Sequence, residues 1–89
     1  MESSATPAFW DTYRRLPREV RRRARRAYAR FDADPSHPSL RFKRVGRGRP
    51  VYPVRVTRGY RALGLRDGNA IVWFWIGSHA EYDRLISGE

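Results

Sequence analysis

The chain has 89 residues, no cysteine, and 19 basic residues against 9 acidic ones, which gives a formal net charge of +10. This length supports one domain, residues 1–89, and the lack of cysteine excludes a disulfide framework and a thiolate metal site. Residues 1–7 contain neither a basic region nor an apolar stretch, and no later segment is apolar enough to span a bilayer. We therefore expect a soluble cytoplasmic protein that does not enter a membrane.

The positive charge is carried almost entirely by arginine, which supplies 18 of the 19 basic residues. Such a field attracts polyanions, either nucleic acid through counterion release or an acidic protein through direct pairing. Arginine also suits phosphate, because its planar fork binds an oxyanion through two hydrogen bonds. The alternative is a genome rich in arginine codons, in which case the charges only solvate the surface.

Two helices are predicted near the start of the chain. Thr6 followed by Pro7 is a helix-start signal, and apolar residues then recur at helical spacing as far as Leu16. Pro17 ends this helix and begins the next one, which extends to about Asp34 with an apolar stripe on one face and arginines on the other. A helical hairpin follows from the short connection.

Strands are predicted after a loop with two prolines, residues 34–38, that stops the second helix. The Asp67-Gly68 pair predicts a tight turn, and the glycine- and arginine-rich residues 46–50 predict a mobile basic loop. The expected strands cover residues 40–45, 51–56, 60–65 and 70–77, and a last short helix is expected over residues 79–86.

The run from Ala70 to Gly77 is the only long uncharged apolar segment, and it predicts the central strand. Both of its alternating faces are apolar, with Trp73 and Trp75 on the same one, so both sides of the sheet should be at least partly covered. We expect an α+β fold in which two N-terminal helices pack on a small antiparallel sheet, with a short C-terminal helix.

Two arginines are predicted to face each other across a hairpin. If residues 57–59 form the loop, Val56 pairs with Tyr60 and Arg55 pairs with Arg61, and the register shifted by one residue would mix apolar with charged partners. Opposed arginines repel each other unless an anion lies between them, so the pair is a candidate phosphate site. The alternative is that both side chains extend to solvent at the rim of the sheet.

Titratable residues gather directly after the central strand. His79 and Tyr82 are three residues apart, so on a helical turn they share a side and can transfer protons together. Glu81 and Asp83 either orient His79 or cap and solvate the final helix, and we favour the second interpretation. Trp75 either stacks on an RNA base or belongs to the core, which is the commoner place for a tryptophan in a central strand. The spacing of the histidines indicates no metal site.

Four segments of the chain together resemble a known family. The resemblance covers the chain from Phe9 to Ile86. The segments are Phe42-Lys43-Arg44, Val51-Tyr52-x-Val54-Arg55-Val56, Gly59-Tyr60-Arg61-Ala62-Leu63-Gly64 and Trp73-Phe74-Trp75-Ile76-Gly77-Ser78-His79-Ala80-Glu81-Tyr82-Asp83-Arg84-Leu85-Ile86. On these segments the chain resembles the RelE/ParE superfamily of bacterial toxins from type II toxin-antitoxin modules.

The resemblance implies a RelE-like toxin that enters the ribosomal A site and cuts mRNA without a metal or another cofactor. In this reaction the ribose 2′-hydroxyl attacks the adjacent phosphate, and positioned cations stabilise the developing charge. By position, Arg61 would stabilise the pentavalent phosphate, and Arg55 would hold the backbone or assist deprotonation. His79 would be the general acid, and Tyr82 matches the family's C-terminal tyrosine only approximately because its spacing is shorter. We further predict RNA contacts at Lys43, Arg44, Arg58 and Trp75.

The chain also departs from the family pattern. The family's first strand has no clear counterpart in residues 1–8, so this edge strand is expected to be missing, and Pro53 predicts an edge or a bulge in its strand. The superfamily includes ParE-like members that inhibit DNA gyrase and lack the catalytic residues, so gyrase inhibition is the alternative function. A third hypothesis is an inactive module that only holds its antitoxin.

The partner expected under each of these hypotheses is an acidic antitoxin, in a hetero-oligomer in which an amphipathic helix or strand covers the basic surface. The nuclease hypothesis adds the ribosome and mRNA as partners.

Overall fold

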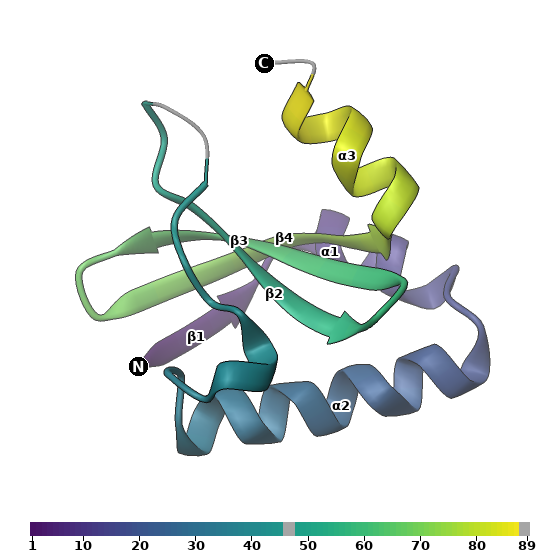
Figure 1. Ribbon diagram of the computed structural model, residues 1–89, viewed down its shortest axis with the longest axis horizontal. Coiled ribbons are helices and arrows are strands. Elements are labelled where there is room, and N and C mark those ends of the chain that lie inside the picture. The colour runs from purple at the N-terminus through teal and green to yellow at the C-terminus, as the bar shows by residue number, and fades with distance from the viewer. Residues whose placement is uncertain (46–47, 88–89) are drawn as a thin grey trace.

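The computed structural model describes residues 1–45 and 48–87, so Gly46 and Arg47 of the predicted basic loop lie outside the described residues. Within the described part, three α-helices and a four-stranded sheet form the predicted α+β fold (Figure 1). The strand order is β1-β4-β3-β2. The strands are β1 (Glu2–Ala5), β2 (Val51–Thr57), β3 (Tyr60–Asp67) and β4 (Ala70–Ser78); the helices are α1 (Pro7–Arg14), α2 (Arg18–Ala33) and α3 (His79–Ser87), with one 3-10 turn, η1 (Pro38–Leu40).

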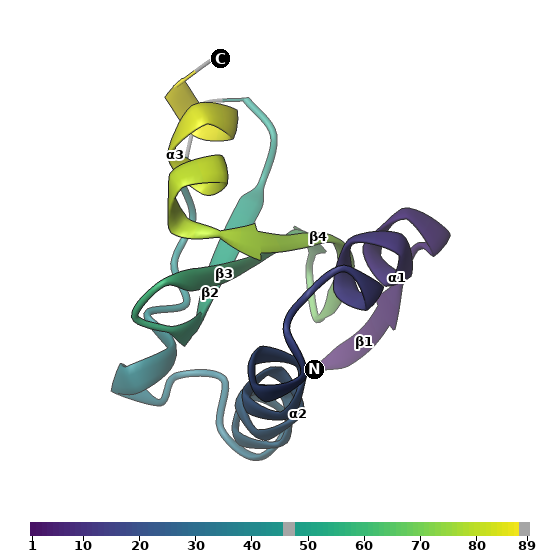
Figure 2. The same cartoon turned by 90° about the vertical axis from the view of Figure 1, so that its right-hand side faces the viewer.

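The helices lie on the two sides of the sheet. Figure 2 shows α2 beneath the sheet and α3 rising from the opposite side, while α1 lies beside β4. The side chain of Thr6 caps α1 by accepting a hydrogen bond from the N–H of Phe9 at 3.1 Å, and Pro7 is the first helical residue. Both predicted N-terminal helices and the C-terminal helix are confirmed. No helix in the described ranges is long and apolar enough to cross a membrane.

A strand forms where the sequence predicts none. β1 pairs in parallel with β4 along its whole length, so the expectation that residues 1–8 lack a strand is wrong. The N–H of Glu2 donates to the carbonyl of Asn69 at 2.8 Å, and the N–H of Thr6 donates to the carbonyl of Trp73 at 2.9 Å. Main-chain pairing needs no alternating side-chain pattern, which is why Glu-Ser-Ser-Ala carries no strand signal. The sheet is therefore mixed rather than antiparallel.

The strand expected over residues 40–45 does not form. Leu40 ends the 3-10 turn and is only 1% exposed, so this apolar residue serves the core rather than a strand. Arg41 has a left-handed φ of 51°, which a continuous strand cannot contain. Val45 makes one isolated bridge to Val51, so β2 is an edge strand over nearly all its length.

A bulge at the end of β2 alters the predicted hairpin. Arg55 pairs with Arg61 as expected, but Tyr60 pairs with Thr57 and leaves Val56 as the extra residue. The predicted pair between Val56 and Tyr60 is therefore wrong, and the loop contains only two residues, 58–59.

A second bulge, in β4, separates the two tryptophans of the central strand. Leu63 pairs with Trp75 and Gly64 pairs with Trp73, so Phe74 is the extra residue. An extra residue reverses the alternation of side chains beyond it, and the prediction that the tryptophans share a face is wrong. Trp73 belongs to the core between the sheet and α2, whereas Trp75 lies on the opposite face of the sheet.

The main core fills the space between the sheet and the two N-terminal helices. Its aromatic centre is Phe31 of α2, whose ring meets those of Trp73 and Phe42 edge to face, with centroids 5.3 and 4.9 Å apart. On the other side of the sheet Leu63 is buried, and Tyr82 of α3 is only 9% exposed. The central strand is thus partly covered on both sides, as predicted. The buried core residues are Leu16, Ala27, Phe31, Leu40, Val54, Ala62, Ile71, Trp73 and Ile76.

Candidate functional site

The candidate site begins with Arg55 and Arg61, which lie opposite each other in the ladder between β2 and β3. Neighbouring residues Val54 and Ala62 belong to the core beneath the sheet, so alternation directs the two arginines away from it. Burial lowers the pKa of Arg61 below its ordinary value, and the like charge of Arg55 lowers this pKa further. Arg61 stays charged at neutral pH. An anion bound beside it would offset both its burial and its repulsion with Arg55.

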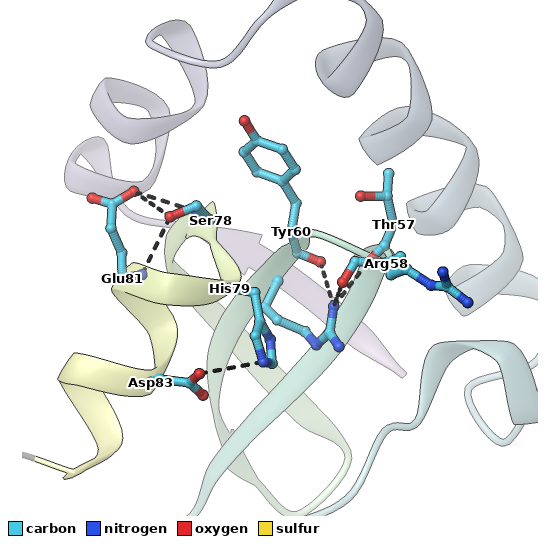
Figure 3. Close-up of polar contacts among 8 residues, drawn as sticks. Thr57, Arg58, Tyr60, Ser78, His79, Glu81 and Asp83 are labelled. Atoms are coloured by element: carbon cyan, nitrogen blue, oxygen red, sulfur yellow. Dashed lines mark hydrogen bonds and ion pairs between the residues drawn. The ribbon is translucent and has the colours of Figure 1, made fainter.

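The guanidinium of Arg61 is anchored through one nitrogen only. Its Nη1 donates to the carbonyl oxygens of Thr57 at 2.8 Å, Tyr60 at 3.0 Å and Arg58 at 3.3 Å, all around the hairpin turn (Figure 3). Its Nε and Nη2 make no hydrogen bond to any residue in the described ranges. A guanidinium has five N–H donors in a planar fork, so the anchored Arg61 keeps donors free for a bidentate contact with phosphate.

The first turn of α3 is fastened to the same hairpin. The N–H of His79 donates to the carbonyl of Gly59 at 2.7 Å, which ties the start of the helix to the turn. The N–H of Ser78 donates to Oε1 of Glu81 at 3.3 Å, and the N–H of Glu81 donates to Oγ of Ser78 at 3.2 Å. These reciprocal bonds are a capping box, and Glu81 is thus a cap, as the sequence favours.

Asp83, in contrast to Glu81, does not cap the helix but contacts His79. Its Oδ2 lies 3.3 Å from Nε2 of His79, one helical turn earlier, and Figure 3 shows the carboxylate pointing at the imidazole. Both side chains are about half exposed, at 49% and 58%, and the other ring nitrogen of His79, Nδ1, makes no hydrogen bond to a described residue. The (i, i+4) spacing on the predicted helix is the signal that would have identified this pair.

Tyr82 lies beside these groups, with its ring centroid 5.9 Å from that of His79. Burial raises the pKa of Tyr82, the charge of Arg61 lowers it by a smaller amount, and the carboxylate of Asp83 raises it again. The phenol is therefore neutral at physiological pH and can donate a hydrogen bond to an anion. Arg41, which sequence reasoning missed, also lowers the pKa of Arg61 by its charge, and nothing in the local pattern marks it.

The structure thus brings Arg55, Arg61, His79 and Tyr82 to the end of the sheet where the hairpin meets α3. A family model described as the ParE-like toxin domain matches residues 18–84, which include the whole of this site. The chain belongs to the ParE-like toxin domain family.

Solved structures share the fold of this ParE-like domain at low sequence identity. The RelB-RelE antitoxin-toxin complex from Methanococcus jannaschii is 17% identical, with a TM-score of 0.71 over 89% of this chain and 94% of that one. The YoeB/ParE toxin from Agrobacterium tumefaciens is 15% identical, with a TM-score of 0.66 over 89% and 99%. The isolated RelE toxin of E. coli is 16% identical, with a TM-score of 0.65 over 98% and 96%. Comparison with curated protein sequences finds no match.

The four predicted RNA contacts of the ParE-like domain occupy different surroundings. Lys43 and Arg44 are exposed on the segment before β2, where Nη2 of Arg44 donates to the carbonyl of Gly48 at 3.0 Å. Arg58 is exposed in the hairpin turn. Trp75 is half-buried on the face that carries α3, and its ring occupies the space where a side chain at residue 77 would begin. No hydrogen bond joins Lys43 or Arg44 to Arg61 among the described residues.

A groove of about 510 Å³ opens on the helix side of the sheet, between α1, α2 and β1. It is lined mostly by apolar and aromatic side chains, and two of them, Trp10 and Tyr28, are 44% and 47% exposed. Exposed aromatic residues around a concave apolar surface are typical of a protein-binding site. In the described ranges no three His, Asp or Glu residues gather closely enough to hold a metal ion.

Proposed function

We propose that this ParE-like domain is the toxin of a toxin-antitoxin module and an endoribonuclease that cuts mRNA on the ribosome. The observation that supports this function best is the arrangement around Arg61. Its free guanidinium donors lie within electrostatic reach of Tyr82 and Asp83, and Asp83 holds His79 at the same end of the sheet. A fixed cation beside oriented proton-transfer groups is the arrangement that phosphate transesterification needs.

In the proposed reaction the 2′-hydroxyl of a ribose attacks the neighbouring phosphate and displaces the 5′-oxygen of the next nucleotide. Arg61 contacts the two phosphate oxygens on which negative charge builds, and the neutral phenol of Tyr82 donates to one of them. Arg55 holds the adjacent backbone or, by its positive charge, favours loss of the 2′-proton to water. His79, oriented by Asp83, protonates the leaving 5′-oxygen. The products are a 2′,3′-cyclic phosphate and a 5′-hydroxyl.

The proposed RNA contacts outside this centre are Lys43, Arg44 and Arg58, with Trp75 as a surface on which a base stacks. The proposed protein partner is an acidic antitoxin. The similar structure from Methanococcus jannaschii is an antitoxin-toxin complex, and the apolar groove beside Trp10 and Tyr28 has the character that the apolar face of an amphipathic helix requires.

The first test is induced expression in cells, with growth measured and the ends of mRNA mapped. We expect growth arrest and cleavage at in-frame codon positions. Arg61→Gln should reduce the cleavage rate by roughly 10²- to 10³-fold, because it removes a positioned cation. His79→Gln should reduce it by roughly 10²- to 10⁴-fold, because it removes a proton-transfer group.

Arg66→Gln is the matched control for Arg61→Gln. Arg66 lies on the same strand, but its guanidinium stacks over the rings of Tyr52 and Phe42 at 5.3 and 5.7 Å, away from the site. This variant should cleave mRNA as the wild type does. A folded wild-type protein that leaves mRNA intact on programmed ribosomes would refute the nuclease function.

The second candidate function is inhibition of DNA gyrase, and the match to a ParE-like family model favours it. Under this function arrest occurs without mRNA cleavage, supercoiling by purified gyrase is inhibited, and His79→Gln changes neither effect. The same expression experiment therefore separates the two functions.

A further inference from the structure

A second concave surface lies between α2 and the edge of β2, and its α2 wall takes no part in the proposed reaction. It is a cleft of about 450 Å³. Its lining includes three arginines of α2, namely Arg23, Arg26 and Arg30, and two residues from the end of the hairpin, Arg55 and Arg58. We call this surface the arginine cleft.

The three arginines from α2 form a continuous row. Residues 23, 26 and 30 are spaced by three and then four positions, so they lie on one face of the helix. With a rise of about 1.5 Å per residue, the row is roughly 10 Å long, which is enough for more than one phosphate. Arg30 is held along the wall of the cleft, because its Nη1 donates to Oγ of Ser39 at 3.1 Å.

The charge of the cleft is not neutralised within the described part of the chain. No acidic residue lines it, and Arg23 and Arg26 make no hydrogen bond or ion pair to a described residue. Other arginines of α2 do have protein partners. Arg22 pairs with Glu19 at 3.0 Å, and Arg21 donates to the carbonyl of Leu16 at 3.0 Å. Three arginines of α2, Arg18, Arg23 and Arg26, have no such partner in the described ranges, and two of them line the cleft.

We infer that the arginine cleft binds the phosphate backbone of RNA, at phosphates separate from the one that Arg61 would hold. Arginine forks recognise phosphate through two parallel hydrogen bonds, and several on one wall can follow successive phosphates. Arg55 and Arg58 are shared with the hairpin of the candidate site, so a strand bound there can continue around the edge of β2 into the cleft. The inference rests on the proposed function in one respect, namely that the phosphate-bearing ligand is RNA.

An acidic protein segment is the competing occupant, and the lining argues against it. A bound peptide helix or strand draws its affinity from apolar anchors in pockets. The arginine cleft is lined by five arginines, Ser39 and Thr57, and its apolar residues are only Ala27, Leu40 and Val56. The larger apolar surface suited to a peptide is the groove on the other side of α2, beside Trp10 and Tyr28.

The test measures binding of the purified protein to a labelled RNA oligonucleotide whose riboses are all 2′-O-methylated, without ribosomes and over a series of salt concentrations. The triple variant Arg23→Gln, Arg26→Gln, Arg30→Gln is compared with the triple variant Arg15→Gln, Arg18→Gln, Arg22→Gln. Both change the net charge by −3, all six arginines are exposed, and none of the control residues lines the cleft.

We expect the cleft variant to bind on the order of tenfold more weakly than the control variant near 0.1 M salt, and to lower the slope of log K against log salt by about two. Exchange of the same three residues for lysine should retain the salt slope but not the full affinity, because lysine keeps the charge and loses the fork. Thermal unfolding shows whether each variant is folded. If the glutamine triple does not fold, Arg26→Gln against Arg22→Gln gives the same comparison with one residue.

Equal losses in the two triples would overturn the inference, since α2 would then contribute only net charge. The inference would also be overturned if poly-glutamate bound the wild type as tightly as the RNA does and bound the cleft variant more weakly by the same factor. The cleft would then be a site for an acidic protein. The methylated RNA cannot be cut at the 2′-hydroxyl. A protein that binds it through the cleft but never cleaves natural mRNA would therefore refute the nuclease function and leave this inference standing.

Discussion

At the scale of single residues, neighbouring groups set the charge states in the candidate site. Arg61 is charged but partly removed from water, and its neighbour across the ladder is another cation. Tyr82 is kept neutral chiefly by burial, although Arg61 favours its ionised form. The site therefore combines positive charge with a protonated phenol, which is the combination that the proposed phosphate contact requires.

The shifted pKa of Tyr82 predicts a loss of stability at alkaline pH. A phenol whose pKa is higher in the folded state contributes stability that is present below the unfolded pKa of about 10 and is lost as pH rises through the folded pKa. Tyr82→Phe should lack this component. Urea unfolding at about pH 8 and about pH 10.5 should show a smaller decrease for Tyr82→Phe than for the wild type. Tyr28→Phe, at an exposed position, is the control, and equal decreases in wild type and Tyr82→Phe would contradict the prediction.

At the scale of elements, the bulge in β4 brings the strand's large side chains into the core. Because Phe74 is extra, Ile71, Trp73 and Ile76 all reach the side of the sheet that α2 covers. Gly64 on β3 makes room for them, since a Cβ built there would lie 2.7 Å from Cγ1 of Ile71 and 2.9 Å from the ring of Trp73. The large side chains of β4 and the glycine opposite them form one packed unit.

Gly64→Ala should therefore destabilise the fold by overpacking. We expect the free energy of unfolding to fall by about 1–3 kcal/mol, because neither Ile71 nor Trp73 has free space to move into. Gly59→Ala is the matched control in the hairpin turn, where a Cβ would meet no atom within 4 Å. It should be neutral or slightly stabilising. Urea midpoints measure both, and a Gly64→Ala protein as stable as Gly59→Ala would contradict this account of the packing.

At the scale of the whole molecule, a charge of +10 on 89 residues opposes compaction while it favours anionic partners. The main basic features lie around β2, where the paired arginines and the arginine cleft meet, and the exposed aromatic groove lies between α1 and α2. One small domain thus has distinct surfaces suited to nucleic acid and to an apolar protein segment.

Repulsion between like charges predicts that added salt stabilises the free domain. Raising NaCl from about 0.05 M to about 0.5 M shortens the screening length several-fold, so the urea midpoint and the melting temperature should both rise. Urea rather than guanidinium chloride is required, because the latter is itself a salt. A melting temperature that falls with NaCl would show that favourable ion pairs dominate over repulsion.

Much of the architecture follows from local patterns in the chain. Thr6 and Pro7 begin α1 because a hydroxyl cap and a fixed φ act within one turn. The alternation of residues 51–56 and 60–65 aligns Arg55 with Arg61, because a register slip would bury charge. The family resemblance adds the roles of Arg61, His79 and Tyr82, which remain predictions.

Other features are decided only by tertiary structure. β1 pairs through its main chain, which leaves no side-chain pattern in residues 2–5. The bulge at Phe74 puts Trp73 and Trp75 on opposite faces, because one extra residue reverses the alternation of side chains. Where such a bulge forms depends on how the strand packs against its neighbours. The arginine cleft requires a helix and a strand edge more than twenty residues apart in sequence to face each other. Local sequence determines the helices and the strands of the β2-β3-β4 meander, whereas long-range packing decides β1, the bulges and which side chains meet.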